Sequence, residues 1–124
     1  MTENIYFVIE LAVNPGRFED LKTLVAELVE ANRNEVGMLT TGWAISDDRQ
    51  VCHIYERFQD SAAVITHLQL FGANFSARFF EILKPTRFVI CGTPSVEVKD
   101  ALAAANPVYM APLGGFRKHP ANDC

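Results

Sequence analysis

The 124-residue sequence lacks several features that would assign it to a functional class. No apolar run is long enough to span a membrane, and no cluster of lysine and arginine indicates nucleic-acid binding. The first residues contain no basic segment followed by an apolar one, so we expect no signal peptide. Together with a net charge of -4, these absences predict a soluble cytoplasmic protein without nucleic-acid or membrane partners.

Cysteine is scarce, and the motifs of common catalytic sites are missing. Three cysteines, Cys52, Cys91 and Cys124, are widely spaced and match neither a C-x-x-C motif nor a zinc pattern. The first two fall in predicted strands, where a free thiol acts as a small buried hydrophobe, and Cys124 is predicted on a mobile C-terminal end. There is no Ser-His-Asp set, phosphate-binding glycine loop or metal-ligand cluster. We therefore expect neither a metal nor an organic cofactor.

Apolar residues make up 49% of the chain and include nine phenylalanines, enough for the core of one domain. Hydrophobic periodicity predicts the order strand, helix, strand, strand, helix, strand. This order is typical of the α+β, ferredoxin-like βαββαβ fold with an antiparallel sheet. The predicted strands span 4–13, 38–46, 50–58 and 86–92. The predicted helices span 17–34 and a region from 60 to 83, which is broken near 71–72 and stopped by Pro85.

The first predicted strand is apolar on both faces, interrupted mainly by Glu10. A single sheet with helices on one side would leave its second apolar face in water. We therefore expect a homodimer in which another copy covers that face. Residues 1–94 form the predicted ferredoxin-like domain, and residues 95–124 form a C-terminal arm with a short helix, a short strand near 108–111 and a mobile end.

The stretch YERFQDSAAVITHL, residues 55–68, resembles the strand-to-helix junction of the antibiotic biosynthesis monooxygenase superfamily. The matching positions are Tyr55, Glu56, an aromatic Phe58, an Asp60 helix start, an alanine at 62 or 63, His67 and Leu68. The resemblance implies a dimeric α+β barrel, and several members of the family oxygenate quinols or polycyclic aromatics without metal or flavin. Some members also exchange an extra C-terminal strand between subunits, which the arm resembles.

The chain departs from parts of the family pattern. Many members carry Trp where this chain has Phe58. The heme-degrading branch has Asn, Trp and His at positions where a gapless comparison places Ile9, His67 and Ala77. Without the histidine ligand at the last position, the resemblance does not extend to heme binding of that type.

His67 is the candidate catalytic residue. Its imidazole can hydrogen-bond a phenol or accept its proton near neutral pH; alternatively, it is a core or interface histidine satisfied by a carbonyl group. Trp43 and Tyr55 are candidates to sandwich a flat aromatic ligand, or else ordinary packing aromatics. Glu56 is expected to pair structurally with an arginine such as Arg87. The remaining candidate pocket residues are Phe58, Phe71, Asn74, Phe75 and Arg78.

These observations leave three hypotheses about function. The first is a cofactor-independent monooxygenase of a small aromatic or quinol-type substrate, with His67 as the base and Tyr55 and Trp43 orienting the substrate. The second is a non-catalytic dimeric barrel that holds a small hydrophobic ligand. The third, ranked lowest, is a heme-related role.

Overall fold

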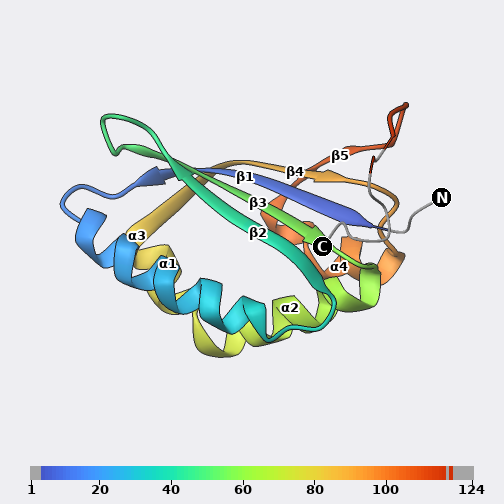
Figure 1. Ribbon diagram of the computed structural model, residues 1–124, viewed down its shortest axis with the longest axis horizontal. Coiled ribbons are helices and arrows are strands. Elements are labelled where there is room, and N and C mark those ends of the chain that lie inside the picture. Colours follow the sequence, from blue (N-terminus) through green and yellow to red (C-terminus); the bar gives the residue numbers. More distant parts are fainter. Residues whose placement is uncertain (1–3, 117, 119–124) are drawn as a thin grey trace.

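The computed structural model describes residues 4–116 and residue 118. Figure 1 shows one sheet with the helices packed on a single face. The elements in chain order are β1 (Ile5–Val13), α1 (Phe18–Arg33), β2 (Met38–Ile45), β3 (Val51–Phe58), α2 (Ser61–Asn74), α3 (Ser76–Ile82), β4 (Leu83–Cys91), α4 (Val96–Ala101), a 3-10 turn η1 (Ala103–Ala105) and β5 (Val108–Met110).

The strand order is β2-β3-β1-β4-β5. The first four strands pair antiparallel, and β5 adds to β4 in parallel. The α+β ferredoxin-like order predicted from the sequence is confirmed, and the short last strand makes the sheet a mixed one of five strands. The sheet and the helices beneath it form the two layers of the domain.

Some boundaries differ from the sequence prediction. Strand β4 begins at Leu83 and contains Pro85, which we expected to lie before the strand. Proline lacks the N–H that a sheet ladder needs, and the pairing of β1 with β4 shifts register between Glu10 and Leu11, directly beside Pro85. The break between α2 and α3 falls at Phe75, later than the predicted break at residues 71–72.

The core lies between the sheet and the helices. On β1 and β3, alternate residues point inward, including Phe7, Leu11, Ile54 and Phe58, which are all buried. Their neighbours, such as Tyr55, point to the other face, which no helix of the described residues covers. The apolar second face predicted for the first strand is thus open in this single chain.

The C-terminal arm packs onto this core. Val98 of α4 and the following Leu102 are buried in one cluster with Ile5 and Phe7. Strand β5 pairs with β4 of its own chain. The mobile end and the location of Cys124, both predicted from the sequence, lie outside the described residues.

Candidate functional site

His67 lies on helix α2 and points toward the inner face of the sheet. Asp60 caps the helix as predicted, since its side chain accepts a hydrogen bond of 2.9 Å from the backbone N–H of Ala63. Two turns on, His67 is only 6% exposed. Its ring lies 5.1 Å from the Phe58 ring and 6.2 Å from the Phe71 ring, centroid to centroid. The imidazole is therefore held between aromatic side chains in the core.

Two buried carboxylates flank this imidazole. Nδ1 of His67 lies 3.1 Å and 3.2 Å from the two carboxylate oxygens of Glu35. Nε2 lies 3.8 Å from Oε2 of Glu56, which is an ion-pair distance and longer than a hydrogen bond. A carboxylate only accepts hydrogen bonds, so the contact with Glu35 is a hydrogen bond when the ring proton is on Nδ1. His67 is thus satisfied by carboxylates, and not by the carbonyl group considered from the sequence.

The surroundings shift the pKa values of both inner groups. Burial raises the pKa of Glu56; the charge of His67 opposes this, and that of Glu35 adds to it. Burial alone lowers the pKa of His67, but the hydrogen bond to Glu35 and the charges of Glu56 and Glu35 outweigh it, so the pKa is raised. Both groups therefore hold protons to higher pH than they would in water, as acid–base groups at active sites often do.

A cavity of about 500 Å³ lies beside these groups, between the sheet and the helices. Its polar lining residues other than Trp43 are Asn32, Glu56 and His67. The rest of the lining is apolar and comes from the sheet, the helices and the arm: Phe7, Ile9, Leu28, Ile54, Leu68, Phe71, Phe79, Phe80, Pro85, Phe88, Ala101, Leu102, Ala104 and Ala105. A volume in this range and a few convergent polar groups are typical of small-molecule sites.

A second, smaller cavity of about 290 Å³ lies between α1 and α2. Four residues, Leu28, Asn32, His67 and Phe71, line both cavities and form the wall between them. Glu35 lines only the smaller cavity, whereas Glu56 lines only the larger one. His67 therefore has one carboxylate on each side of the wall.

The structure brings some of the predicted pocket residues together and separates others. Trp43 and Phe71 line the larger cavity. Phe58 packs against His67 but does not line this cavity. Asn74 and Phe75 line the smaller cavity. Arg78 instead forms an ion pair of 2.8 Å with Glu27 on the surface.

The sandwich of Trp43 and Tyr55 does not form within this chain. Trp43 pairs with Ile54 across the sheet and points inward, whereas Tyr55 is the next residue along β3 and points to the opposite face, where it is 44% exposed. Successive side chains of a strand alternate between faces. An aromatic ligand in the cavity would therefore contact Trp43 and not Tyr55 of the same chain.

The sequence did not indicate a functional role for Glu35 or Glu56, the two carboxylates beside His67. Glu35 lies just after the helix predicted over residues 17–34 and was not among the candidate site residues. Glu56 was expected to pair with Arg87, but Arg87 lies opposite Glu10, and Glu56 faces His67. The signal for Glu56 was present, because it alternates with buried Ile54 and Phe58 on one face of β3. A carboxylate in such a series is predicted to be buried and to need a partner.

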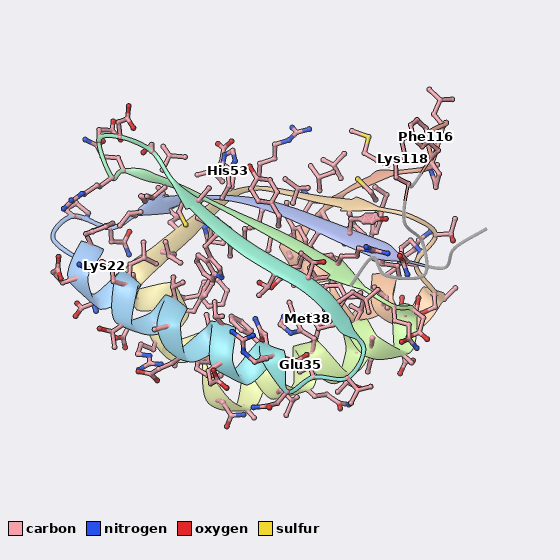
Figure 2. The ribbon with its side chains drawn as sticks, viewed as in Figure 1. Lys22, Glu35, Met38, His53, Phe116 and Lys118 are labelled. Atoms are coloured by element: carbon pink, nitrogen blue, oxygen red, sulfur yellow. The ribbon has the colours of Figure 1, made fainter. Side chains whose placement is uncertain are left out.

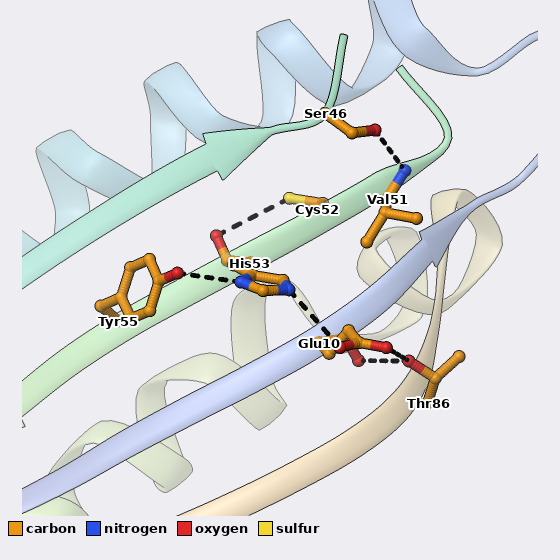
Figure 3. Close-up of polar contacts among 7 residues, drawn as sticks. All are labelled: Glu10, Ser46, Val51, Cys52, His53, Tyr55 and Thr86. Atoms are coloured by element: carbon orange, nitrogen blue, oxygen red, sulfur yellow. Dashed lines mark hydrogen bonds and ion pairs between the residues drawn. The ribbon is translucent and has the colours of Figure 1, made fainter. Parts of the chain in front are cut away.

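The outer face carries a different polar network, centred on His53. Figure 2 shows His53 on the side of the sheet away from the helices, and Glu35 on the helix side. Nδ1 of His53 lies 2.8 Å from the Tyr55 hydroxyl, and Nε2 lies 3.5 Å from Oε1 of Glu10. The Thr86 hydroxyl donates to the other oxygen of Glu10 at 3.1 Å (Figure 3). This network lies on the uncovered face of the sheet.

The residues at the positions used by the heme-degrading branch do not fit a heme. Ile9 offers no polar atom, Ala77 is exposed on α3 and has no ligating group, and His67 is already held by two carboxylates. Within residues 4–116 and 118, no group of three or more His, Cys, Asp or Glu side chains is placed to hold a metal ion.

Known proteins of the same architecture share this α+β fold. MupZ from Pseudomonas fluorescens superposes with a TM-score of 0.87 at 18% identity, over 98% of this chain and 94% of that one. SnoaB from Streptomyces nogalater, a cofactor-independent oxygenase, superposes with a TM-score of 0.65 at 11% identity, over 77% of this chain and 97% of that one. A conserved protein from Methanosarcina mazei superposes with a TM-score of 0.64 at 22% identity, over 72% of this chain and 91% of that one. At these identities, the similarity establishes the fold.

The family is established by sequence. The family model for antibiotic biosynthesis monooxygenase matches residues 4–71, more than half of the chain, from β1 through most of α2. The chain belongs to this family, as the junction at residues 55–68 indicated. No curated protein matches the chain. No helix among the described residues combines the length and apolar character needed to cross a membrane.

Proposed function

We propose that the protein is a cofactor-independent monooxygenase that acts on a small aromatic or quinol-type substrate. The observation that carries the proposal is the opening of the Glu56–His67 pair into a largely apolar cavity of about 500 Å³. SnoaB, a cofactor-independent oxygenase, has the same fold, which supports this class of reaction by analogy.

The chemistry required of the protein is the removal of a proton. A phenol or quinol that has lost its proton is an electron-rich anion that can itself reduce dioxygen. One oxygen atom then enters the substrate, and the other leaves as water with two substrate hydrogens. We assign the acceptance of the first proton to Glu56 and His67, whose raised pKa values make them stronger bases than the same side chains in water. The apolar lining excludes water from the reactive anion.

The substrate is oriented by the shape of the cavity. Trp43, Phe71 and Phe79 provide flat apolar surfaces, and Glu56 and His67 lie next to each other in the wall. An aromatic substrate is therefore expected to place its hydroxyl group against Glu56 and His67 and its rings against the aromatic side chains.

A homodimer is part of the proposal. The uncovered face of the sheet presents half-buried Tyr6 and Val8 and exposed Val51 and Tyr55. Apolar side chains exposed together on a sheet face, here beside the His53 network, often mark a protein–protein contact. A second copy would cover this face, and light scattering at micromolar concentration is expected to give the mass of a dimer. A monomeric mass would contradict this part of the proposal.

Oxygen uptake with a panel of quinols and phenols tests the catalytic part. We expect consumption by the natural chain, and loss of roughly 10²- to 10⁴-fold in the rate for His67→Ala, which is the usual contribution of a general base. His53→Ala removes a histidine from the outer face and is the matched control. If the natural chain consumes oxygen no faster than His67→Ala with every substrate, His67 has no catalytic role.

The second candidate function is the binding of a small hydrophobic ligand without turnover. The apolar lining favours it equally. Trp43, the only tryptophan, lines the cavity, so its fluorescence is expected to change when an aromatic ligand binds. If ligands change the Trp43 fluorescence but none of them supports oxygen uptake, the protein binds its ligand without catalysis.

A further inference from the structure

Glu35 has no role in the proton transfer described above, although it makes the shortest polar contacts of His67. It lies in the loop between α1 and β2, and its side chain is 7% exposed. Both of its carboxylate oxygens are within 3.2 Å of Nδ1 of His67. A buried carboxylate is costly unless it is paired, so this placement needs a compensating role.

The loop that carries Glu35 is fixed at several points. The backbone N–H of Glu35 donates to Asn32 O at 3.0 Å, and its carbonyl accepts from the Met38 N–H at 3.1 Å. The Gly37 carbonyl accepts from Gln59 at 2.8 Å. A Cβ atom at Gly37 would overlap the Cβ of Ala63 in α2, so only glycine lets the loop approach the helix this closely. The position of Glu35 relative to α2 is therefore set by the backbone.

We infer that Glu35 is a positioning residue, which fixes a proton on Nδ1 of His67 and leaves Nε2 facing Glu56 and the larger cavity. The inference rests on the proposed use of His67 as an acid–base group. A neutral imidazole has one N–H and one lone pair, and the group that accepts from one nitrogen decides which nitrogen carries the lone pair. With Nδ1 held by Glu35, His67 exchanges protons at Nε2.

The two cavities support this assignment. Glu35 lines the smaller cavity and Glu56 the larger one, while His67 is in the wall between them. The titratable groups in contact with the imidazole are thus Glu35 on one side and Glu56 on the other. Phe58 and Phe71 pack against the ring and hinder its rotation. A ring held in this way presents the same nitrogen to the cavity in every cycle.

Nuclear magnetic resonance of the histidine ring nitrogens tests the inference on the free protein. The His67 signals are identified by their loss in His67→Asn. In the natural chain, we expect the neutral ring to carry its proton on Nδ1. Glu35→Gln keeps a hydrogen-bond acceptor of the same shape but removes the charge, so the Nδ1 tautomer should persist while the titration midpoint of His67 falls by about 1–3 pH units.

The matched control is Glu30→Gln, which removes one negative charge from a well-exposed position on α1 near Arg33. It is expected to leave the titration of His67 unchanged. A neutral ring protonated on Nε2 in the natural chain, or an unchanged midpoint in Glu35→Gln, would overturn the inference. Since glutamine has the size of glutamate, Glu35→Gln is expected to fold, and the dispersion of its resonances shows whether it has folded.

Oxygen uptake separates this inference from the proposed function. If both hold, Glu35→Gln lowers kcat by roughly tenfold with little change in KM, because it weakens the base without removing a substrate contact. The acid limb of the pH–rate profile should also move to lower pH. If the natural chain takes up no oxygen but the resonance shifts occur as expected, the oxygenase proposal fails and the positioning role stands.

Discussion

Strand β3 contributes to two histidine–carboxylate networks on opposite faces of the sheet. On the outer face, His53 and Glu10 are 3.5 Å apart, with side chains 38% and 45% exposed. On the inner face, His67 and Glu35 are 3.1 Å apart, with side chains 8% and 7% exposed. The residue types and distances are similar, and the main difference is the access of water.

This difference determines what each network can do. Water and salt screen the interaction between partly exposed charges, so such pairs contribute little. Between buried groups the screening is weak, and each charge strongly affects the protonation of its neighbour. The inner network can therefore hold and transfer protons in an apolar cavity, while the outer one acts as a polar patch on the sheet.

The largest effect is expected when a carboxylate of the inner network is replaced and the rate is compared with that of the same change in the outer network. Glu56→Gln removes a proton acceptor from the cavity and is expected to slow oxygen uptake by roughly 10²- to 10⁴-fold. Glu10→Gln makes the same chemical change on the outer face and should leave the rate within about twofold. Steady-state oxygen consumption measures both. Equal losses in the two variants would show that the inner network has no special role.

The second contrast concerns packing on β3. Phe58 is fully buried and touches His67 and Phe7, so Phe58→Ala is expected to lower the free energy of unfolding by about 3–5 kcal/mol. Tyr55→Ala removes a ring from the outer face and should cost about 1 kcal/mol or less in the monomer. Urea unfolding at low protein concentration measures both. A larger loss for Tyr55→Ala would indicate that the outer face is part of the folded core, for example through a tight dimer.

The third contrast uses the two described cysteines, one on each face. Cys52 is buried on the inner face, and burial raises the pKa of its thiol to about 11. At neutral pH, it should therefore carry about a hundredfold less thiolate than an ordinary cysteine. Cys91 is half-buried on the outer face. In a Cys124→Ser background, a thiol reagent is expected to modify Cys91 first, and mass spectrometry identifies the site. Modification of Cys52 first would mean that the inner face opens readily.

The fold was largely predictable because it depends on patterns that run along the whole chain. The hydrophobic periodicity over residues 17–34 and the Asp60 helix start each correspond to one element in the structure. The boundaries were less predictable. Pro85 marks the end of a helix in the sequence, but the register shift beside Glu10 lets it lie within β4.

The site was only partly predictable because it depends on contacts between distant segments. His67 was identified from its place in the family motif, and its burial agrees with a specific role. Its partner Glu35 is 32 positions away and lies in a loop, so no periodicity connects the two. Tyr55 was placed in the pocket because of its residue type, although its position on β3 puts it on the outer face.

The smallest expected effect is on the pH dependence of stability. The pKa of Glu56 is raised above its ordinary value of 4.5, and that of His67 above its ordinary value of 6.5. In each case, the folded protein binds the proton more tightly than the unfolded chain does. The contribution of each group to stability is therefore complete below its ordinary pKa, and it is lost as the pH rises through the pKa of the folded state.

Both groups thus act in the same direction, and the protein should lose about 1 kcal/mol or more of stability as the pH rises from mildly acidic to alkaline values. Urea unfolding at a series of pH values measures this slope. Glu56→Gln should flatten the slope because glutamine does not titrate, whereas Glu10→Gln on the exposed face should leave it unchanged. A natural chain whose stability is constant above pH 6.5 would show that the carboxylates do not hold the proton on His67.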